Sequence, residues 1–191
     1  MSKGFKINIK NLHYALLLKD DETGVEYGPI QKIPGLMEIT VTPNVLEGKL
    51  YGDGAVRDQE SMLESLGVAM NLNKLPLKNR AEMRGNEYEK GELTENRDDK
   101  APYLAMAWEV ETTTGKSELV WMLKGKMAPP TDELKQREGN ITYNTNNTNF
   151  LFIPREYDGD IRKFADGNDE LIETTKIENW FKQVPGTVVA P

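Results

Sequence analysis

The sequence contains no cysteine and a single histidine, and these two scarcities exclude several kinds of site. Without thiols the chain forms no disulfide bond, no thiolate metal site and no cysteine nucleophile. The histidine, His13, stands beside Tyr14 in an apolar stretch, and no spacing of carboxylates supplies the further ligands that a metal ion needs. We therefore expect His13 to be structural, and we expect no metal and no cofactor.

Residues that carry nucleophilic or phosphate chemistry are also missing. None of the four serines stands in a Gly-x-Ser-x-Gly elbow. The glycine-rich residues 48–54 do not match a phosphate-binding spacing, and the acidic turns at 158–160 and 166–170 do not match a calcium loop. No base is matched to a nucleophile, so the sequence predicts a protein that is not an enzyme.

The sequence has no run of about 20 apolar residues, so no membrane span is expected. The first residues lack the apolar core of a signal peptide. A net charge of -7 disfavours a surface that binds nucleic acid by neutralising phosphates. One basic cluster, around residues 74–84, is interpreted as a docking face or a solvated surface rather than a DNA groove; it contains Lys74, Lys78, Arg80 and Arg84.

What the sequence does contain is alternation of apolar and polar residues, most clearly over residues 101–127. This period of two predicts a β-hairpin with its turn at 112–116, where Gly115 can take a positive φ. Trp108 and Trp121 fall on the faces assigned to the core. The predicted core faces are Leu104, Met106, Trp108 and Val110 in the first strand and Leu119, Trp121, Leu123 and Met127 in the second.

The remaining pattern predicts a mainly β (α+β) protein that forms a single domain over residues 1–191. Further strands are expected at 12–19, 36–42, 66–72 and 140–154, and a small hairpin is expected around Gly91. A short helix is expected at 76–84, closed by Gly85. A second is expected at 174–184, with Thr174 or Thr175 as N-cap.

Three segments carry too few apolar residues to anchor themselves. Residues 1–11 predict an N-terminal arm that is disordered or donated to a neighbour, and residues 185–191 predict a C-terminal tail. Residues 43–65 predict a long loop that is either a floppy hairpin or packs on another molecule. Because edges and loops of this kind are satisfied by assembly, the sequence favours a protein that associates with copies of itself.

Short sequence segments, in a fixed order over nearly the whole chain, carry a resemblance to a known family. They are NLHYA at 11–15, GVEYG at 24–28, LYGD at 50–53, LPL at 75–77, GNEY at 85–88, DDKAPY at 98–103, VWMLKGK at 120–126 and IENWF at 177–181. In these the chain resembles the major tail proteins, or tail tube subunits, of long non-contractile-tailed bacteriophages of Gram-positive bacteria.

The resemblance implies a tail-tube-like β-sandwich or barrel with one or two short flanking helices and a long inter-strand loop. It implies a structural virion protein that self-assembles into stacked hexameric rings, forming the tail tube through which genome DNA passes during infection without specific binding. The implied partners are the protein itself, a tape-measure protein, a tail tip or initiator and a tail terminator. The implied location is the phage tail of the virion, assembled in the host bacterial cytoplasm, with no membrane.

The resemblance also suggests which residues meet other subunits or face the lumen. Residues expected between rings or subunits, all in the 43–65 segment, are Pro43, Asn44, Leu46, Leu50, Tyr51, Asp53, Val56 and Arg57. Acidic residues that are candidates for the lumen are Asp20, Asp21, Glu22 and Glu38.

Two alternatives stay open. The chain could be another phage or secretion tube component. It could also be a binding module with a β-sandwich fold, recognising carbohydrate or a host surface, with Trp108, Trp121 or Tyr143 as a stacking platform.

Overall fold

The computed structural model describes residues 4–136 and 143–188 and confirms the mainly β class with two short helices. The strands are β1 (Lys6–Asp21), β2 (Gly24–Tyr27), β3 (Gln31–Ile33), β4 (Leu36–Gly52), β5 (Ala55–Leu72), β6 (Glu87–Glu89), β7 (Glu92–Thr94), β8 (Leu104–Thr112), β9 (Ser117–Met127), β10 (Asn146–Phe152) and β11 (Arg162–Asp166). The helices are α1 (Leu77–Arg84) and α2 (Thr174–Asn179). Neither helix is long and apolar enough to span a membrane.

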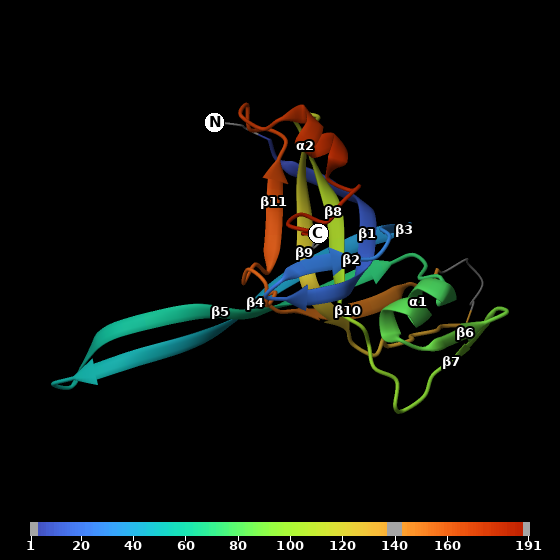
Figure 1. The fold of residues 1–191 in the computed structure, drawn as a ribbon, viewed down its shortest axis with the longest axis horizontal. Helices are drawn as coiled ribbons and strands as arrows, with labels where there is room; N and C mark the ends of the chain where they lie inside the picture. The colour runs from blue at the N-terminus through green and yellow to red at the C-terminus, as the bar shows by residue number, and fades with distance from the viewer. Residues whose placement is uncertain (1–3, 137–142, 189–191) are drawn as a thin grey trace.

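The strands form one large antiparallel sheet with the order β2-β1-β8-β9-β10-β5-β4 (Figure 1). β3 extends the sheet on β1, and β11 pairs with the first half of β9, whereas β10 pairs with its last residues. The sheet curls, so Ile39 and Val41 of β4 pack against the same core as Ile9 of β1. The arrangement is consistent with a β-sandwich, and the small β6–β7 hairpin lies beside α1.

The predicted β8–β9 hairpin is confirmed, and both of its faces are buried. Leu104, Met106 and Trp108 face the main core, as predicted. The prediction for β9 was wrong in part, because Val120 and Met122 face the main core while the predicted set divides between two clusters. Leu119, Trp121 and Leu123 pack in a second cluster, but Met127 packs in the main one.

A register shift explains why Met127 changes side. Leu104 pairs with Gly125 but Met106 pairs with Met122, so β9 contains an extra residue at this point. A bulge reverses the alternation beyond it, because the next side chain points to the opposite face. The sequence pattern cannot show this shift, since it depends on the partner strand.

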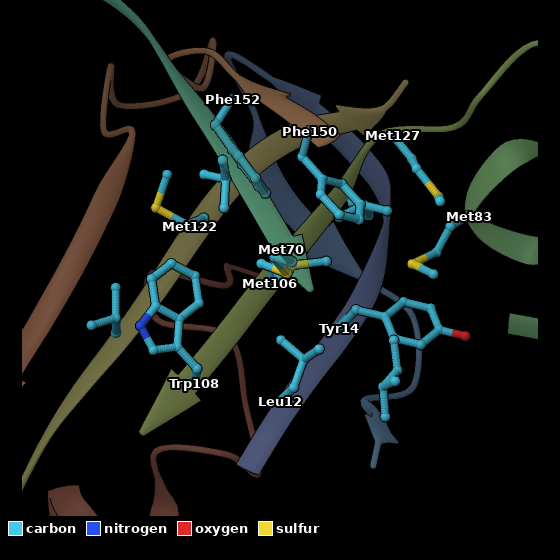
Figure 2. Packing of buried hydrophobic residues seen from close by; sticks show 14 of the residues in the cluster. Leu12, Tyr14, Met70, Met83, Met106, Trp108, Met122, Met127, Phe150 and Phe152 are labelled. Atoms are coloured by element: carbon cyan, nitrogen blue, oxygen red, sulfur yellow. The ribbon is translucent and has the colours of Figure 1, made fainter. Parts of the chain in front are cut away.

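The main core is rich in methionine and aromatic side chains (Figure 2). Figure 2 shows Met70 and Met106 in its centre, with Met122 and Trp108 to the left and the two phenylalanines of β10 above. Flexible thioether side chains fill irregular spaces between rings, which suits a sheet that curls over itself. Met83 of α1 also packs in this cluster and fastens the helix to the body.

The second cluster lies on the opposite face of β8 and β9, beneath the C-terminal segment. Trp180 and Val184 are buried there against Trp121, whose Nε1 donates a hydrogen bond to the Trp180 carbonyl at 2.8 Å. The helix in this segment is shorter than predicted. It ends at Asn179, and its N-cap is Glu173 rather than Thr174 or Thr175.

The predicted arms are partly ordered within the described residues. β1 begins at Lys6 and pairs with β8 from Thr112 onward, so residues 6–11 form a strand of the sheet rather than a free arm. Near the other end, the Val188 amide donates to the Val25 carbonyl at 3.0 Å. Residues 1–3 and 189–191, also assigned to these arms, lie outside the described residues, as do 140–142 of the predicted strand 140–154.

Smaller predictions have mixed outcomes. Gly85 closes α1 with a φ of 70°, and Lys90 and Gly91 form the turn between β6 and β7, both as predicted. β11 was not predicted, because its five residues alternate weakly. Its pairing with β9 depends on a neighbour distant in the sequence.

Candidate interaction surface

Residues 43–64 form the feature that departs most from the rest of the molecule. The sequence predicted a long loop that is either a floppy hairpin or packs on another molecule. The structure shows a hairpin, in which the outer halves of β4 and β5 pair with each other as a two-stranded ribbon (Figure 1). Apart from Gly52, every residue of this ribbon is exposed. Figure 1 shows it leaving the body and extending well beyond it. We call residues 43–64 the ribbon.

The tip of the ribbon is a tight two-residue turn. Asp53 and Gly54 have φ values of 53° and 79°, the positive values that a hairpin turn of this length requires. The Arg57 side chain closes the tip, because it pairs with the Asp53 carboxylate at 2.6 Å and donates to the Gly52 carbonyl at 3.2 Å. The ribbon is therefore a defined hairpin, although it has no core of its own.

The register assigns the ribbon side chains to two faces, because cross-strand partners lie side by side and neighbours along a strand alternate. Leu46 lies opposite Met62, Gly48 opposite Glu60 and Leu50 opposite Asp58. The face formed by Leu46, Leu50, Asp58, Glu60 and Met62 is named here the acidic face of the ribbon. The other face carries Val45, Lys49, Tyr51, Val56 and Leu63.

Both faces expose large apolar side chains. Leu50, Tyr51 and Met62 are each about two-thirds exposed, at 64%, 66% and 66%. Several large apolar side chains exposed together on one projecting element are typical of an interaction site. The ribbon is therefore the strongest candidate for contact with another molecule.

The eight residues predicted to contact other subunits all lie in β4, β5 or the turn between them. Pro43 and Asn44 are at the root, where the Asn44 amide donates to the buried Ser65 hydroxyl at 2.9 Å. The prediction missed Val45, Met62 and Leu63, which stand in the same exposed rows. The Asp53-Gly54 pair, flanked by alternating residues, was the signal that could have found them.

A second candidate surface lies where the two ends of the sheet approach each other. Among the described residues, β4 pairs only with β5, and residues 6–10 of β1 pair only with β8. A groove of about 480 Å³ separates these free edges. Its apolar lining includes Ile7, Ile9, Met37, Ile39 and Val41. Unpaired backbone groups beside apolar side chains are a template for strand addition.

The four acidic candidates have different surroundings. Asp20 is buried, with its side chain 5% exposed, and pairs with the equally buried Lys124 at 2.7 Å. Asp21 caps its own turn by accepting a hydrogen bond from the Thr23 amide at 2.7 Å. Glu22 and Glu38 are exposed. Asp20 therefore does not face solvent, and three candidates remain.

The Asp20 carboxylate has a structural role. Burial alone would raise its pKa, but hydrogen bonds from Lys124 and from the backbone amides of Glu156 and Tyr157 outweigh burial and hold the pKa below its usual value. The Lys124 ammonium also pairs with Glu156 at 2.9 Å. These contacts join β1, β9 and the segment after β10.

The tryptophans offer no stacking platform. Trp108 is 5% exposed and Trp121 is fully buried, as predicted for core residues. Of the three aromatic residues considered for a carbohydrate-binding face, Tyr143 alone is exposed. The carbohydrate interpretation therefore loses the two rings on which it depended.

In the basic cluster around residues 74–84, the two arginines are held by partners in the body, whereas the two lysines are exposed. Arg80 pairs with Asp132 at 2.8 Å and Glu95 at 2.9 Å, and Arg84 donates to the Met127 carbonyl at 2.7 Å. Lys74 and Lys78 are exposed and form no ion pair within the part of the chain that the structure describes. The free positive charge is thus confined to the beginning of α1.

A polar network fixes α1 on the body. The Tyr14 hydroxyl, held between β1 and the helix, donates to Glu82 at 2.7 Å and accepts from the Asn79 amide at 2.9 Å. Burial and the Glu82 carboxylate raise the pKa of Tyr14 far above its usual value, so the hydroxyl stays protonated. These hydrogen bonds therefore fix the position of α1 relative to β1.

His13 has the structural role that the sequence predicted. Its ring stacks on Phe181 with a centroid distance of 4.7 Å, and Nδ1 lies 2.7 Å from the Asn11 carbonyl. Burial lowers the pKa of the imidazole. No group of histidine, aspartate or glutamate side chains in residues 4–136 and 143–188 has the arrangement of a metal site.

One further groove, of about 550 Å³, lies between α2 and the β8–β9 turn; we call it the α2 groove. Its floor contains Glu109, which accepts hydrogen bonds from Asn11 and Ser117, each at 2.6 Å. Asp169 and Glu170 stand at its rim, and Ile177 and Phe181 form an apolar wall. The carboxylate of Glu109 is satisfied by these two neighbours.

Comparisons with known proteins add two structural likenesses. No family model matches the sequence, and no curated protein matches it. The anti-feeding prophage cap, a tube-terminating cap solved by cryo-EM, has a TM-score of 0.47 and 8% identity over 87% of this chain and 95% of that chain. A chain of the anti-feeding prophage baseplate has a TM-score of 0.46 and 9% identity over 88% and 100%. These are parts of a phage-tail-related assembly, and at such TM-scores the likeness assigns no function to this chain.

Proposed function

We propose that this chain is a structural subunit of a phage tail tube. Copies join edge to edge into a hexameric ring, and rings stack so that a hollow tube conducts DNA during infection. The observation that carries the proposal is the ribbon, because its seven large apolar side chains are between 39% and 66% exposed. The resemblance to major tail proteins of siphophages supports the same interpretation.

Ring formation would use the two free edges of the sheet. If the β4 edge of one copy pairs with the β1 edge of the next, the unpaired backbone groups of both edges are satisfied. An interface between two different surfaces generates a closed ring when the rotation between copies closes. A closed ring also removes the exposed edges that make a lone subunit prone to unspecific pairing.

The acidic character of the chain suits a conduit for DNA. A net charge of -7 repels phosphate rather than binding it, so DNA would pass without being held. Asp21, Glu22 and Glu38 are the proposed lumen residues, since their side chains are exposed. The further partners proposed are a tape-measure protein inside the tube, a tip or initiator complex and a terminator, and the proposed location is the tail of the virion.

Deletion of residues 47–57 tests the proposal. The deletion leaves residues 58–61 as a connection between Leu46 and Met62, which are cross-strand partners in the intact ribbon. Because the deleted residues bury nothing, we expect an unchanged melting temperature and circular dichroism spectrum. We also expect loss of tubes in negative-stain images, both alone and with a tail tip complex added.

Two results would contradict the proposal. One is a deletion variant that still forms tubes as long as those of the intact chain. The other is an intact chain that gives neither rings nor tubes at high concentration with the tip complex present.

A further inference from the structure

The ribbon needs a receiving surface on the neighbouring copy, and its charge restricts which surface can serve. Residues 43–65 carry five carboxylates and two basic side chains, a net charge of -3. The carboxylates are Glu47, Asp53, Asp58, Glu60 and Glu64, and the basic residues are Lys49 and Arg57. On the acidic face of the ribbon, Asp58 and Glu60 stand among Leu46, Leu50 and Met62. A partner surface must therefore combine an exposed apolar residue with positive charge.

The outer surface of α1 has this combination. Leu77, at the start of the helix, is half exposed, at 50%, while Ala81 and Met83 further along the helix are buried against the body. Lys78 follows Leu77 on the helix and Lys74 precedes it, both exposed. We call Lys74, Leu77 and Lys78 the α1 face.

The ribbon and the α1 face lie at opposite ends of the molecule. Figure 1 shows the ribbon leaving the body at one end and α1 at the other, along the longest axis. A copy displaced along this axis brings its ribbon to the α1 end of the first. Such a contact joins two different surfaces and repeats without limit, which is the geometry of a growing filament.

We propose that the acidic face of the ribbon docks on the α1 face of a second copy of this chain, with Asp58 and Glu60 against Lys74 and Lys78 and the apolar side chains of the ribbon against Leu77. This proposal rests on the proposed function, because it names the surface that receives the ribbon when subunits stack. It predicts a head-to-tail contact whose strength falls as salt rises, since exposed charges are screened.

Other charges on the surface agree with this choice. The α2 groove also has an apolar wall, but Asp169 and Glu170 in its lining repel the acidic face of the ribbon. Near α1 itself, Glu87, Glu89 and Glu92 stand on the β6–β7 hairpin, which follows the carboxyl end of the helix. At this helix, Lys74 and Lys78 therefore place positive charge at the amino-terminal end.

Disulfide trapping in the full-length chain tests the contact directly, because the wild-type sequence has no cysteine to interfere. A copy with Met62→Cys is mixed with a copy with Leu77→Cys under mild oxidation. Both positions are exposed, so neither change disturbs the core. We expect cross-linked dimers on a non-reducing gel, and a ladder of multimers when one chain carries both changes. Raising the salt concentration should reduce the yield.

The matched control replaces Leu77→Cys by Leu171→Cys, which places a thiol on the exposed loop beside the α2 groove. We expect a much lower yield from this pair. Equal yields from the two pairs, or a higher yield from the control, would overturn the proposed docking. If the intact chain forms tubes while the Met62→Cys and Leu77→Cys pair gives no cross-link, the docking proposal fails and the tube proposal stands.

Charge reversal gives a second, independent measurement. Asp58→Lys with Glu60→Lys, or Lys74→Glu with Lys78→Glu, should raise the concentration needed for assembly by about tenfold, because two exposed ion pairs become repulsive. A chain that carries all four changes should regain assembly, whereas Asp169→Lys with Glu170→Lys should have little effect. Failure of the fourfold variant to recover, with every variant folded, would contradict the proposal.

Discussion

β4 and β5 each pass through two environments, because one half of each strand lies in the body and the other half lies in the exposed ribbon. In the inner half of β5, Leu66, Val68, Met70 and Leu72 are buried in the main core. In the outer half, beyond Ser65, the same strand buries nothing, although its hydrogen-bonded register with β4 continues to the tip. Backbone pairing is thus present in both halves, but side-chain packing is present in only one.

The two halves therefore differ in what stabilises them: side-chain burial and backbone pairing in the inner halves, but backbone pairing alone in the ribbon. Fixing a residue in a strand costs about 1–2 kcal/mol of conformational entropy, and burial of apolar surface is the main compensation. A two-stranded hairpin without packing is marginally stable in water. The inner halves are therefore stabilised by burial in their own core, while the ribbon lacks this burial, and the proposed contact with a second copy would supply it.

The largest loss of stability is expected from a substitution in the body, at Trp121 in the second cluster. Trp121→Ala deletes a fully buried indole and its hydrogen bond to the Trp180 carbonyl. We expect a loss of about 3–5 kcal/mol in the free energy of unfolding, measured by urea denaturation. A loss below about 1 kcal/mol would mean that α2 and the segment after it do not pack on β9 as described.

A glycine in each region gives a matched pair of smaller changes. At Gly125 of β9, an added methyl group would lie 2.5 Å from the buried Phe152 ring, whereas at Gly48 of the ribbon no atom lies within 4 Å. We expect Gly125→Ala to destabilise the chain by about 1–3 kcal/mol, since an overpacked core must shift. Gly48→Ala should change stability by about 0.5 kcal/mol or less. Urea denaturation measures both changes. Equal changes in unfolding free energy for the two variants would contradict the difference in packing between the body and the ribbon.

The sequence predicted the body better than the ribbon, and the reason is physical. The alternation over residues 101–127 reflects burial within the chain, so β8, β9 and the buried tryptophans were found. The sequence predicted a long loop for residues 43–65, with a hairpin as one of two alternatives, because its apolar content is low and its glycines resemble turn residues. Its strand structure depends on pairing between residues such as Leu46 and Met62, which are distant in the sequence.

Two other differences arise from partners distant in the sequence. Lys124 was placed on an outward face, yet it is buried because Asp20, distant in the sequence, neutralises it. The apolar spacing at 177–184 correctly marked Trp180 and Val184 as buried residues, but it predicted a longer helix. The chain there continues in tighter turns, such as the Lys182 amide donating to the Asn179 carbonyl at 2.9 Å, which keep both side chains on the sheet.

The buried Asp20–Lys124 pair predicts a pH dependence confined to the body. The pKa of Asp20 is lower in the folded chain than its ordinary value of 3.8. Its contribution is therefore complete above the unfolded pKa and is lost as the pH falls through the folded pKa. At neutral pH, Asp20→Asn should cost about 1–2 kcal/mol, because Lys124 loses a charged hydrogen-bond partner.

The measurement is urea denaturation of the wild type and Asp20→Asn between pH 7 and the lowest pH at which both fold. The difference in unfolding free energy should shrink once the pH is below 3.8, while other acidic groups titrate in both proteins and cancel. A difference that stays constant across this range would show that the ionised carboxylate of Asp20 is not what stabilises the fold.

The smallest expected effect on folding is in the ribbon, and it is the sharpest test of the contrast. Leu50→Ser with Tyr51→Ser removes two side chains that are 64% and 66% exposed and contribute nothing to either core. The unfolding free energy of the free chain should change by about 0.5 kcal/mol or less, because exposed apolar groups lose little when truncated. Assembly should nevertheless weaken, since Leu50 lies on the acidic face that is proposed to dock on a second copy. A loss of more than about 1 kcal/mol in the free chain would show that the ribbon packs on its own body, and the need for a second copy would disappear.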